Sequence, residues 1–500
     1  MISTLHAGYG GYEKNEEMQE TGLTDQTWEW EKTSSGIRLT KYTGHEAEVI
    51  LPSEIEGEPV RILASHAFYE NGMDIERIVT PSTLRIIEPY ACEFCMSLTD
   101  FVIAEGVEVL GREFLIATQI EKLSIPSTVY WIEEPAELGL TLDISPENPW
   151  YYIDGTALFR RGKHPEELGY SYSDIVGGDL SEDGCLDLAD GKLSEDGFRD
   201  TAGGVSLETI LPEMEFQDYA VPEGVTYIAH DAFESQDMLE RITLPATLAD
   251  IAEGVLSNPK SHFAKGRGIH KIIIAEGNPV FFTDERGLYK SLPDGGIELI
   301  KYLGRKHDLV LGDAIHVIGR GAFIKSKVEQ ITIPKTVEKI YPDAFLDCPI
   351  NEVDFQAFGF SMYFPSEHAY VLKQVLEGFG QNEKLYDFFY YDRVLKDDAL
   401  NAEKAKMCIY RLHYPRDLSE ETAQYLRGRI AEKLAFFVEQ LGEHGELMTL
   451  QWMCELGFFD RGNIDDLIES LNRAGHREAM AVLMDYKNRE LGNEEFSFEL

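Results

Sequence analysis

The feature that most constrains the fold is a short repeat that recurs over the first two thirds of the chain. Each unit has an apolar segment, a proline or small residue, two apolar positions at intervals of three residues, and then a small–bulky pair. Contiguous units begin 22 or 23 residues apart, a period found in solenoid repeats. The units begin at Pro52 (with an insertion), Pro81, Ala104, Pro126, Pro222, Pro245, Gly312 and Pro334.

This repeat predicts a solenoid, because a unit of this length can bury its apolar residues only against the next unit. The segments before the proline slot, such as IERIVTP and VEQITIP, have the β-branched composition of strands. Proline fits at a strand end, where no ladder N–H is required. The bulky residue of each pair, as in Ala322–Phe323, should turn into the core. The predicted fold class is an α/β repeat solenoid with one parallel β-sheet.

The units resemble the BspA-like leucine-rich repeat family, whose hallmark is I-x-I-P, then V-x-x-I-G, then A-F. The resemblance is clearest at Ile125–Pro126, Ile333–Pro334 and Ile318–Gly319. Residues 36–44 also match residues 296–304 at six of nine positions. Residues 148–160 align without a gap to 278–290, and this N-P stretch looks like the β-hairpin spacer of that family. The resemblance implies a bacterial repeat scaffold that binds proteins or surface ligands.

Charge excludes several classes of partner. The chain has 500 residues, with 45 Lys/Arg, 89 Asp/Glu and a formal net charge of −44. Nucleic acids and anionic membranes need basic clusters, and we find no basic run, so neither partner is expected. Residues 1–20 lack the pattern of a secretory leader, and no apolar stretch is long enough for a membrane span. A cytoplasmic location is expected, with a secreted or cell-surface location as the alternative.

An acidic segment separates two repeat blocks. Between Pro165 and Asp218 lie fifteen Asp/Glu and two Lys/Arg, and LSEDG occurs twice, at 180–184 and 193–197. The segment lacks the EF-hand and RTX calcium patterns, so we interpret it as a solvated loop with a hairpin at the LSEDG turns. The predicted domains are an N-terminal leader segment 1–35, a first repeat block 36–161, an acidic insert 162–219, a second repeat block 220–365 and an α-helical domain 366–500.

Helical spacing replaces the strand pattern after about residue 366. Leu426, Ile430, Leu434, Phe437 and Leu441 form one stripe, and Ser419 is placed to cap that helix. Shorter helices are expected at 446–456 and 464–473, ended by glycines 457 and 475, and a last helix at 476–490. The segment weakly resembles ankyrin-type helix pairs. It is interpreted as a cap on the solenoid core or, alternatively, as a second interaction module or dimer face.

The sequence contains no nucleophile elbow, phosphate-binding loop or H-E-x-x-H motif. Cys92 and Cys95 form a lone CxxC, but Cys92 occupies a ring slot of the repeat, so core packing is favoured over redox or zinc chemistry. His66 and His230 are expected at the solenoid surface. The run Phe388–Tyr391 is expected on the buried side of a helix. No catalytic, cofactor-binding or metal-binding residue, and no cofactor, is assigned.

The predicted function is non-enzymatic binding of a protein partner through the sheet face of the solenoid. The alternatives are a surface or secreted adhesin for host protein or glycan and, less favoured, an enzyme with its site in the helical domain. Basic residues beside the outward strand positions could form cross-repeat charge ladders or bind an acidic partner. Homo-oligomerisation through the helical domain is possible. The candidate binding residues are Arg77, Val79, Val102, Lys122, Ser124, Arg241, Thr243, Lys271, Ile273 and Thr332.

Overall fold

In a computed structural model, the chain forms two compact units. The first comprises residues 1–216, 222–237 and 250–255, and the second comprises residues 217–221, 238–249 and 256–500. The described residues are 21–24, 27–70, 72–165, 179–180, 186–187, 203–211, 214, 216–234, 236–257, 269–341, 343–356, 359–365, 370–376, 388–397 and 400–492.

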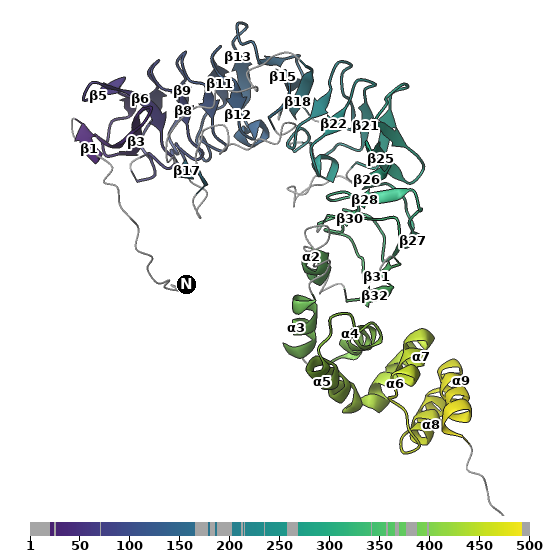
Figure 1. Ribbon diagram of the computed structural model, residues 1–500. Coiled ribbons are helices and arrows are strands. Elements are labelled where there is room, and N and C mark those ends of the chain that lie inside the picture. Colours follow the sequence, from purple (N-terminus) through teal and green to yellow (C-terminus); the bar gives the residue numbers. More distant parts are fainter. Residues whose placement is uncertain are drawn as a thin grey trace, which may run out of the picture. The chain divides into compact units, whose positions relative to one another are not determined.

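The first unit is a solenoid with two rows of parallel strands (Figure 1). One row comes from the predicted I-x-I-P segments: β4 (Glu48–Ile50), β7 (Arg77–Val79) and β9 (Asp100–Val102), then the pair β11 (Lys122–Ile125) and β13 (Thr141–Ile144). The other begins with β3 (Gly36–Tyr42), from the GIRLTKY segment. It continues with strands from the V-x-x-I segments: β6 (Glu58–Leu63), β8 (Ile86–Ile87), β10 (Val109–Leu110) and β12 (Trp131–Ile132). The predicted repeat solenoid is confirmed, and the expectation of one sheet is extended by this second row. Both segments of a repeat stack at the same period, so both can form ladders.

Short antiparallel strands begin the solenoid. The strands β1 (Thr21–Thr24) and β2 (Trp28–Thr33) pair antiparallel, and β2 pairs antiparallel with β3. The short strand β5 (Glu54–Ile55) pairs antiparallel with β6. Thus the chain enters the parallel row through a hairpin, and residues from Trp28 onward belong to the core of the first unit.

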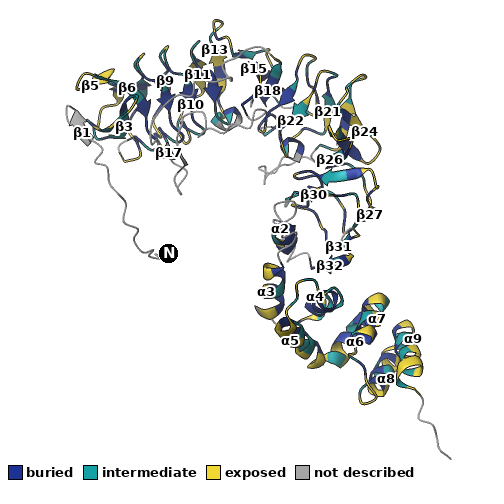
Figure 2. Cartoon of the chain, viewed as in Figure 1, coloured by how far each residue is buried: buried dark blue, intermediate teal, exposed yellow. Residues whose placement is uncertain are grey.

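The small–bulky pairs turn inward, as the repeat predicts. Ala67–Phe68, Ala91–Cys92 and Phe114–Leu115 are buried in the first unit, and Ala322–Phe323 and Ala344–Phe345 are buried in the second. Figure 2 shows the buried residues along the inside of both strand rows. Cys92 and Cys95 are both fully buried and unbridged, so the packing interpretation of this CxxC is confirmed.

The asparagine of each N-P motif forms hydrogen bonds that connect one repeat to the hairpin that follows it. The Asn148 side-chain amide donates to the carbonyls of Pro126 and Val129, each at 2.9 Å, and its Oδ1 accepts from Tyr151 N at 2.8 Å. Asn278 makes the same contacts in the second unit, donating to Pro245 and Leu248 at 3.0 Å. The motif therefore satisfies buried carbonyls where the solenoid is interrupted.

In the first unit a sheet of five strands follows this motif, with a short 3-10 turn at Pro135–Leu138 before it. Its strands are β14 (Tyr151–Ile153), β15 (Ala157–Arg161), β18 (Val205–Ile210), β20 (Tyr227–Ile228) and β22 (Asp250–Ile251). In the acidic insert, β16 (Asp179–Leu180) and β17 (Leu186–Asp187) pair antiparallel around the first LSEDG motif, as expected of a hairpin. The second LSEDG motif lies outside the described residues.

The second unit repeats the two-row arrangement. The first row consists of two sheets. One contains β19 (Asp218–Ala220), β21 (Arg241–Leu244) and β23 (Lys271–Ile274). The other contains β27 (Asp308–Val310), β29 (Gln330–Ile333), β31 (Glu352–Phe355) and the antiparallel β32 (Phe360–Tyr363). The other row consists of β24 (Phe281–Thr283), β25 (Gly287–Ser291), β26 (Ile297–Tyr302), β28 (Ile315–Ile318) and β30 (Lys339–Ile340). A 3-10 turn lies at Val255–Ser257.

Helices follow the last strands and share their core. They are α2 (Tyr370–Leu376), α3 (Phe389–Asp397), α4 (Ala402–His413), α5 (Glu420–Ala431), α6 (Leu434–Glu443), α7 (Leu447–Glu455), α8 (Ile464–Ala474) and α9 (Arg477–Tyr486), followed by a π-helical turn at Lys487–Leu491. One continuous apolar cluster extends from Tyr289 to Leu483. Phe360 of the last strand contacts Phe388, with ring centroids 5.8 Å apart. The helices therefore cover the end of the solenoid core in this unit.

The predicted helix boundaries hold in part. Ser419 caps α5 and accepts from Thr422 N at 3.2 Å, and Gly475 ends α8 in the left-handed region with φ 85°. The stripe from Leu426 to Leu441 spans α5 and α6 rather than one helix, because the chain turns at residues 432–433. In the aromatic run, Phe388 and Tyr391 are buried, whereas Phe389 and Tyr390 are exposed.

Candidate binding surfaces

The predicted binding residues all lie on strands of the first row described for each unit. The alternation of the strands buries Ile78, Phe101, Leu123, Ile242 and Ile331 and leaves their neighbours facing outward. Val79, Val102, Thr243 and Thr332 are half-buried, and Ser124 and Ile273 are exposed. The register places Val79 beside Val102, and Thr243 beside Ile273. The structure thus brings Arg77, Val79 and Val102 together on one sheet, and the candidates of β21 and β23 together on another. Lys122 and Ser124 lie on the separate β11–β13 pair, and Thr332 lies on the separate sheet that contains β29.

The basic candidates are paired with carboxylates of adjacent repeats. Arg77 lies between Glu48, at 3.2 Å, and Asp100, to which it also forms an ion pair. Lys122 contacts Asp143 at 2.8 Å, and Arg241 contacts Asp218 at 3.1 Å. Of the two interpretations from the sequence, the structure contains the cross-repeat ladder. Such exposed pairs contribute little stability, at most about 1 kcal/mol each, but they hold the side chains in fixed positions.

Lys271 differs from the other basic candidates. It is exposed and lies next to Arg241 in the ladder, so two like charges are neighbours there. Within the described part of the chain, Lys271 has no ion pair. This end of the second unit's sheet is therefore more positive than the first unit's sheet.

An apolar column runs beside the charged column in the first unit. Ile50, Val79 and Val102 are register neighbours on β4, β7 and β9. Ile50 is 69% exposed, and the two valines are half-buried. A large aliphatic side chain with this exposure at the edge of a column is a contact that a partner could cover.

Exposed aromatic and methionine side chains on the turns were missed from the sequence. Tyr69 and Phe94 are 60% and 44% exposed, and their ring centroids lie 6.3 Å apart. Met73, Met96 and Ile116 are also exposed. The signal was present, because apolar residues follow the small–bulky pair in consecutive repeats. Only the structure distinguishes these outward positions from core positions.

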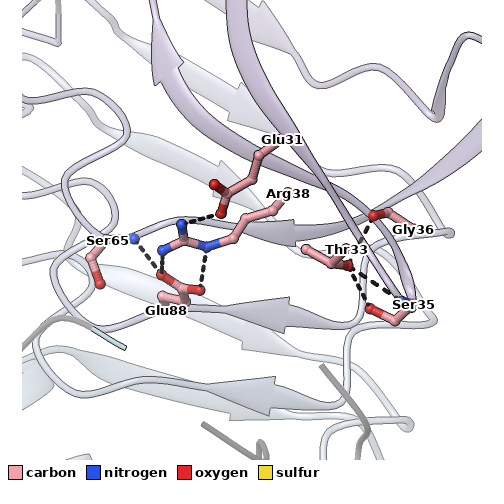
Figure 3. Close-up of polar contacts among 7 residues, drawn as sticks. All are labelled: Glu31, Thr33, Ser35, Gly36, Arg38, Ser65 and Glu88. Atoms are coloured by element: carbon pink, nitrogen blue, oxygen red, sulfur yellow. Dashed lines mark hydrogen bonds and ion pairs between the residues drawn. The ribbon is translucent and has the colours of Figure 1, made fainter. Parts of the chain in front are cut away.

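An ionic cluster centred on the buried Glu88 holds repeats together (Figure 3). Arg38 donates to Glu88 through Nε at 2.8 Å and Nη2 at 2.6 Å, and to Glu31 through Nη1 at 2.7 Å. Glu88 is fully buried and also accepts from Ser65 N at 2.8 Å. The carboxylates raise the pKa of Arg38 against the opposing effect of burial. With its groups satisfied internally, this cluster has a structural role.

The two singled-out histidines lie at the solenoid surface, as predicted. His66 Nδ1 lies 2.8 Å from a Glu93 carboxylate oxygen, and its ring stacks on Tyr90 with centroids 5.7 Å apart. His230 is exposed and its Nδ1 lies 3.2 Å from the carbonyl of Glu253. Neither histidine contacts a nucleophile in these interactions.

A small pocket lies in the helical region, where a catalytic site was one hypothesis. It has a volume of about 130 Å³ and lies against α4 and α6, with Tyr363 of β32 on one wall. Lys406 and Glu446 form an ion pair at 2.6 Å across it. Nearby, burial raises the pKa of Glu352, which accepts a hydrogen bond from the Tyr410 hydroxyl at 2.8 Å. The polar groups of this region are thus largely engaged with each other.

Neither a metal-binding cluster nor a membrane-spanning helix is found among the described residues. Over that part of the chain, no cluster of three or more His, Cys, Asp or Glu side chains could hold a metal ion. No helix within the same ranges is long and apolar enough to cross a membrane.

Comparison with known proteins assigns the repeat type. The family described as "BspA type Leucine rich repeat region" matches in six copies over residues 48–136, 211–265 and 305–363. A leucine rich cell surface protein from Faecalibacterium prausnitzii is 16% identical with a TM-score of 0.30, covering 68% of this chain and 96% of that one. The pneumococcal vaccine antigen PcpA is 13% identical with a TM-score of 0.28, covering 67% and 70%. A leucine-rich repeat protein from Bacteroides ovatus is 13% identical with a TM-score of 0.26, covering 69% and 76%. No curated protein matches the chain.

The stacked parallel rows and the buried small–bulky pairs define a leucine-rich repeat solenoid. The sequence match then gives the particular type: the repeats at residues 48–136, 211–265 and 305–363 are of the BspA-type leucine-rich repeat. Proteins of this architecture are repeat scaffolds of the kind found in surface and interaction proteins. The resemblance of the helical region to ankyrin-type helix pairs stays a prediction.

Proposed function

We propose that this chain is a non-enzymatic scaffold that binds a protein partner through the sheet face of its first repeat block. The observation behind this proposal is the apolar column Ile50–Val79–Val102, which lies beside a column of ion-paired charges. Interfaces commonly combine an apolar centre with a polar rim. Here the two columns supply both on one surface.

The ion pairs favour binding by fixing side chains before a partner arrives. Arg77 is held from both sides, by Glu48 and Asp100, so little rotamer entropy remains to be lost on association. The same pairing means that Arg77 and Lys122 do not act as free cations. We therefore assign the affinity to the aliphatic column and the choice of partner to the alternating charges.

Site-specific photo-crosslinking tests this surface. A benzophenone amino acid replaces Val79 in one chain and Glu147, an exposed residue off the sheet, in a control chain. Both are irradiated in a lysate of the native host. We expect a discrete adduct from position 79, none from position 147, and loss of the position 79 adduct when Ile50→Glu is added. Equal adducts at both positions, or no adduct at position 79, would show that the sheet is not the contact.

The alternative function is a surface or secreted adhesin that binds a host protein or glycan. Its support is the contact between the exposed rings of Tyr69 and Phe94, because sugar rings pack against aromatic faces. A glycan array probed with the whole chain and with Tyr69→Ala decides between the two. Glycan binding that Tyr69→Ala abolishes favours the adhesin, and an empty array favours the protein scaffold.

A further inference from the structure

The two repeat blocks share a local backbone geometry at one corner, but the side chains at that corner carry opposite charge. Residues 36–44 and 296–304 align, so Lys41 and Tyr42 correspond to Lys301 and Tyr302. The backbone repeats this correspondence. Tyr42 N donates to the carbonyl of Ala67 at 2.7 Å, and Tyr302 N donates to the carbonyl of Ala322 at 2.8 Å. Each lysine therefore lies at the same corner of its own block.

In the second block, a lysine occupies the position that corresponds to the carboxylate partner of Lys41. Lys41 forms an ion pair with Glu70 at 2.6 Å, three residues beyond Ala67. Three residues beyond Ala322 the chain has Lys325. Lys301 is only 5% exposed, and its ammonium reaches a backbone carbonyl, that of Ile324, at 3.3 Å. The second corner thus holds a buried lysine without an anionic partner in the described structure.

A second carboxylate is replaced in the same way. The Tyr42 hydroxyl donates to the Glu46 carboxylate and accepts from Glu46 N at 3.3 Å. In the second block Lys306 follows Tyr302 by the same four residues, and its backbone N–H also reaches the tyrosine hydroxyl. The local backbone is therefore retained while the side-chain charge is reversed.

Two further positions add positive charge at this corner. The carbonyl of Thr27 accepts from Thr43 N at 2.8 Å, and the carbonyl of Arg286 accepts from Leu303 N at 2.6 Å, so Arg286 stands in the place of Thr27. Arg305 stands where the first block has His45. Within the described residues, none of Arg286, Lys301, Arg305, Lys306 and Lys325 forms an ion pair. The nearby Asp284 carboxylate accepts from the backbone N–H groups of Arg286 and Gly287.

The segments around this corner carry a local excess of positive charge between the acidic residues Asp284, Glu285 and Asp343. Residues 286–341 contain ten Lys/Arg and six Asp/Glu, although the whole chain has a net charge of −44. The protonated form of a buried amine beside a second lysine is unfavourable unless an anion is bound, because burial penalises the charged form. Burial, with a smaller contribution from Lys325, lowers the pKa of Lys301 to about 7. By contrast, the hydrogen bond to Glu70 raises the pKa of Lys41.

We propose that the corner formed by Lys301 and Lys325 binds a small oxyanion of the phosphate class, and that the exposed Arg286, Arg305 and Lys306 nearby add to the local positive charge. The anion takes the place that the Glu70 carboxylate occupies beside Lys41 in the first block. Phosphate matches this pair because both ammonium groups can donate charge-assisted hydrogen bonds to its oxygens. This site includes no residue of the sheet face of the first repeat block. A negative result here would therefore not contradict the proposed protein binding.

Calorimetric titration of the whole chain with inorganic phosphate tests the site, at constant ionic strength with chloride as the balancing anion. Lys325→Glu restores the pairing of the first block and should fold normally, since that block accommodates it. We expect saturable binding of phosphate to the unmodified chain. In Lys325→Glu we expect the affinity for phosphate to fall by about tenfold or more. The control is Lys335→Glu, an exposed lysine of the same block with the same change in net charge.

The results separate a built site from general attraction. Weaker binding in Lys325→Glu with unchanged binding in Lys335→Glu supports the proposal. An equal loss in both variants means that phosphate responds only to net charge, and overturns it. The absence of saturable binding to the unmodified chain also overturns it. As a second readout, phosphate should raise the unfolding temperature of the unmodified chain and not that of Lys325→Glu.

Discussion

Arg38 and Glu88 form a two-bond ion pair across 50 residues of sequence, with donor–acceptor distances of 2.8 and 2.6 Å. Arg38 lies on β3, and Glu88 directly follows β8, with β6 between them in the sheet. The pair therefore fastens the entry strands of the solenoid to a later repeat. Its carboxylate has no contact with water, because Glu88 is fully buried.

Glu88→Ala should destabilise the first unit strongly. The change leaves the mostly buried Arg38 guanidinium with one carboxylate, Glu31, and removes the acceptor of Ser65 N. Breaking a buried pair from one side costs about 3–5 kcal/mol. Urea unfolding followed by hydrogen exchange over residues 37–88 measures the loss. The matched control is Glu58→Ala, which removes an exposed pair with Lys32 and should change stability by about 1 kcal/mol at most. Equal effects of the two changes would contradict the assigned role.

Lys301→Met should stabilise the second unit in a pH-dependent way. The pKa of Lys301 falls from 10.5 to about 7 on folding. Between these values the unfolded chain binds more protons than the folded chain, so the stability of the unmodified protein rises with pH. The penalty for charging Lys301 is complete below pH 7 and disappears toward pH 10.5. The variant should thus gain roughly 3–5 kcal/mol at pH 6, and the gain should shrink as pH rises.

Urea unfolding at several pH values without phosphate measures this difference. Lys335→Met serves as the control, because Lys335 is exposed and its replacement should shift stability by about 0.5 kcal/mol or less at every pH. A constant difference between Lys301→Met and the unmodified chain would show that Lys301 titrates normally.

The neighbouring residues Phe388 and Phe389 allow a direct test of the helical cap. Phe388 is buried, its ring lies against Phe360, and the Arg411 guanidinium lies 4.2 Å from its centroid. Phe389 is 62% exposed. Phe388→Ala should cost about 3–5 kcal/mol, and Phe389→Ala about 0.5 kcal/mol or less. Thermal unfolding of the two variants decides, and similar transitions would show that the helices do not cover the solenoid core.

Truncation after residue 365 separates a cap from an assembly module. Removing the helices should expose Phe355, Phe360 and Phe364, which are buried in the intact chain, so we expect aggregation or unfolding of chain 1–365. Size exclusion with light scattering compares it with the 500-residue chain. If the truncated chain stays monomeric while the complete chain is dimeric, the helices serve assembly, and their exposed Phe436 and Met448 are the first contacts to examine.

The cysteines should be unreactive in the folded chain. Cys92, Cys95, Cys348, Cys408 and Cys454 are buried and free. Burial raises the pKa of Cys348 to about 11 and of Cys408 and Cys454 to about 12. Because the thiolate is the reactive form, a Cys185→Ser chain should show almost no reaction with a disulfide reagent at pH 8 when native. In urea all five thiols should react. Rapid native labelling of Cys92 or Cys95 would instead favour a redox role for the CxxC motif.

Local patterns allowed much of the fold to be predicted. The period of 22 or 23 residues implied stacking, because each unit must bury its apolar side against another. Ser419 and Gly475 marked helix ends correctly, since caps depend on a few neighbouring residues. The turn at residues 432–433 was not predicted, because apolar spacing alone does not show whether a stripe belongs to one helix or two.

The candidate sites depended far more on which residues become neighbours. The outward positions of the strands followed from alternation, so Val79 and Thr243 could be placed from sequence. The pairing of Arg77 with Glu48 and Asp100 could not, because it depends on the register between separate repeats. For the same reason no basic run in the sequence marks the corner around Lys301, because the charges near it come from segments up to 39 residues apart in the chain.

The sequence by itself determined the repeat, the stacking of parallel strands, the buried small–bulky pairs and the change to helices, because each of these arises from local periodicity and side-chain volume. The tertiary structure alone decided the second strand row, the Arg38–Glu88 pair and the charge inversion between the corners of Lys41 and Lys301. These features need atoms from different repeats within a few ångströms of each other. Such distances are set only when the turns of the solenoid stack.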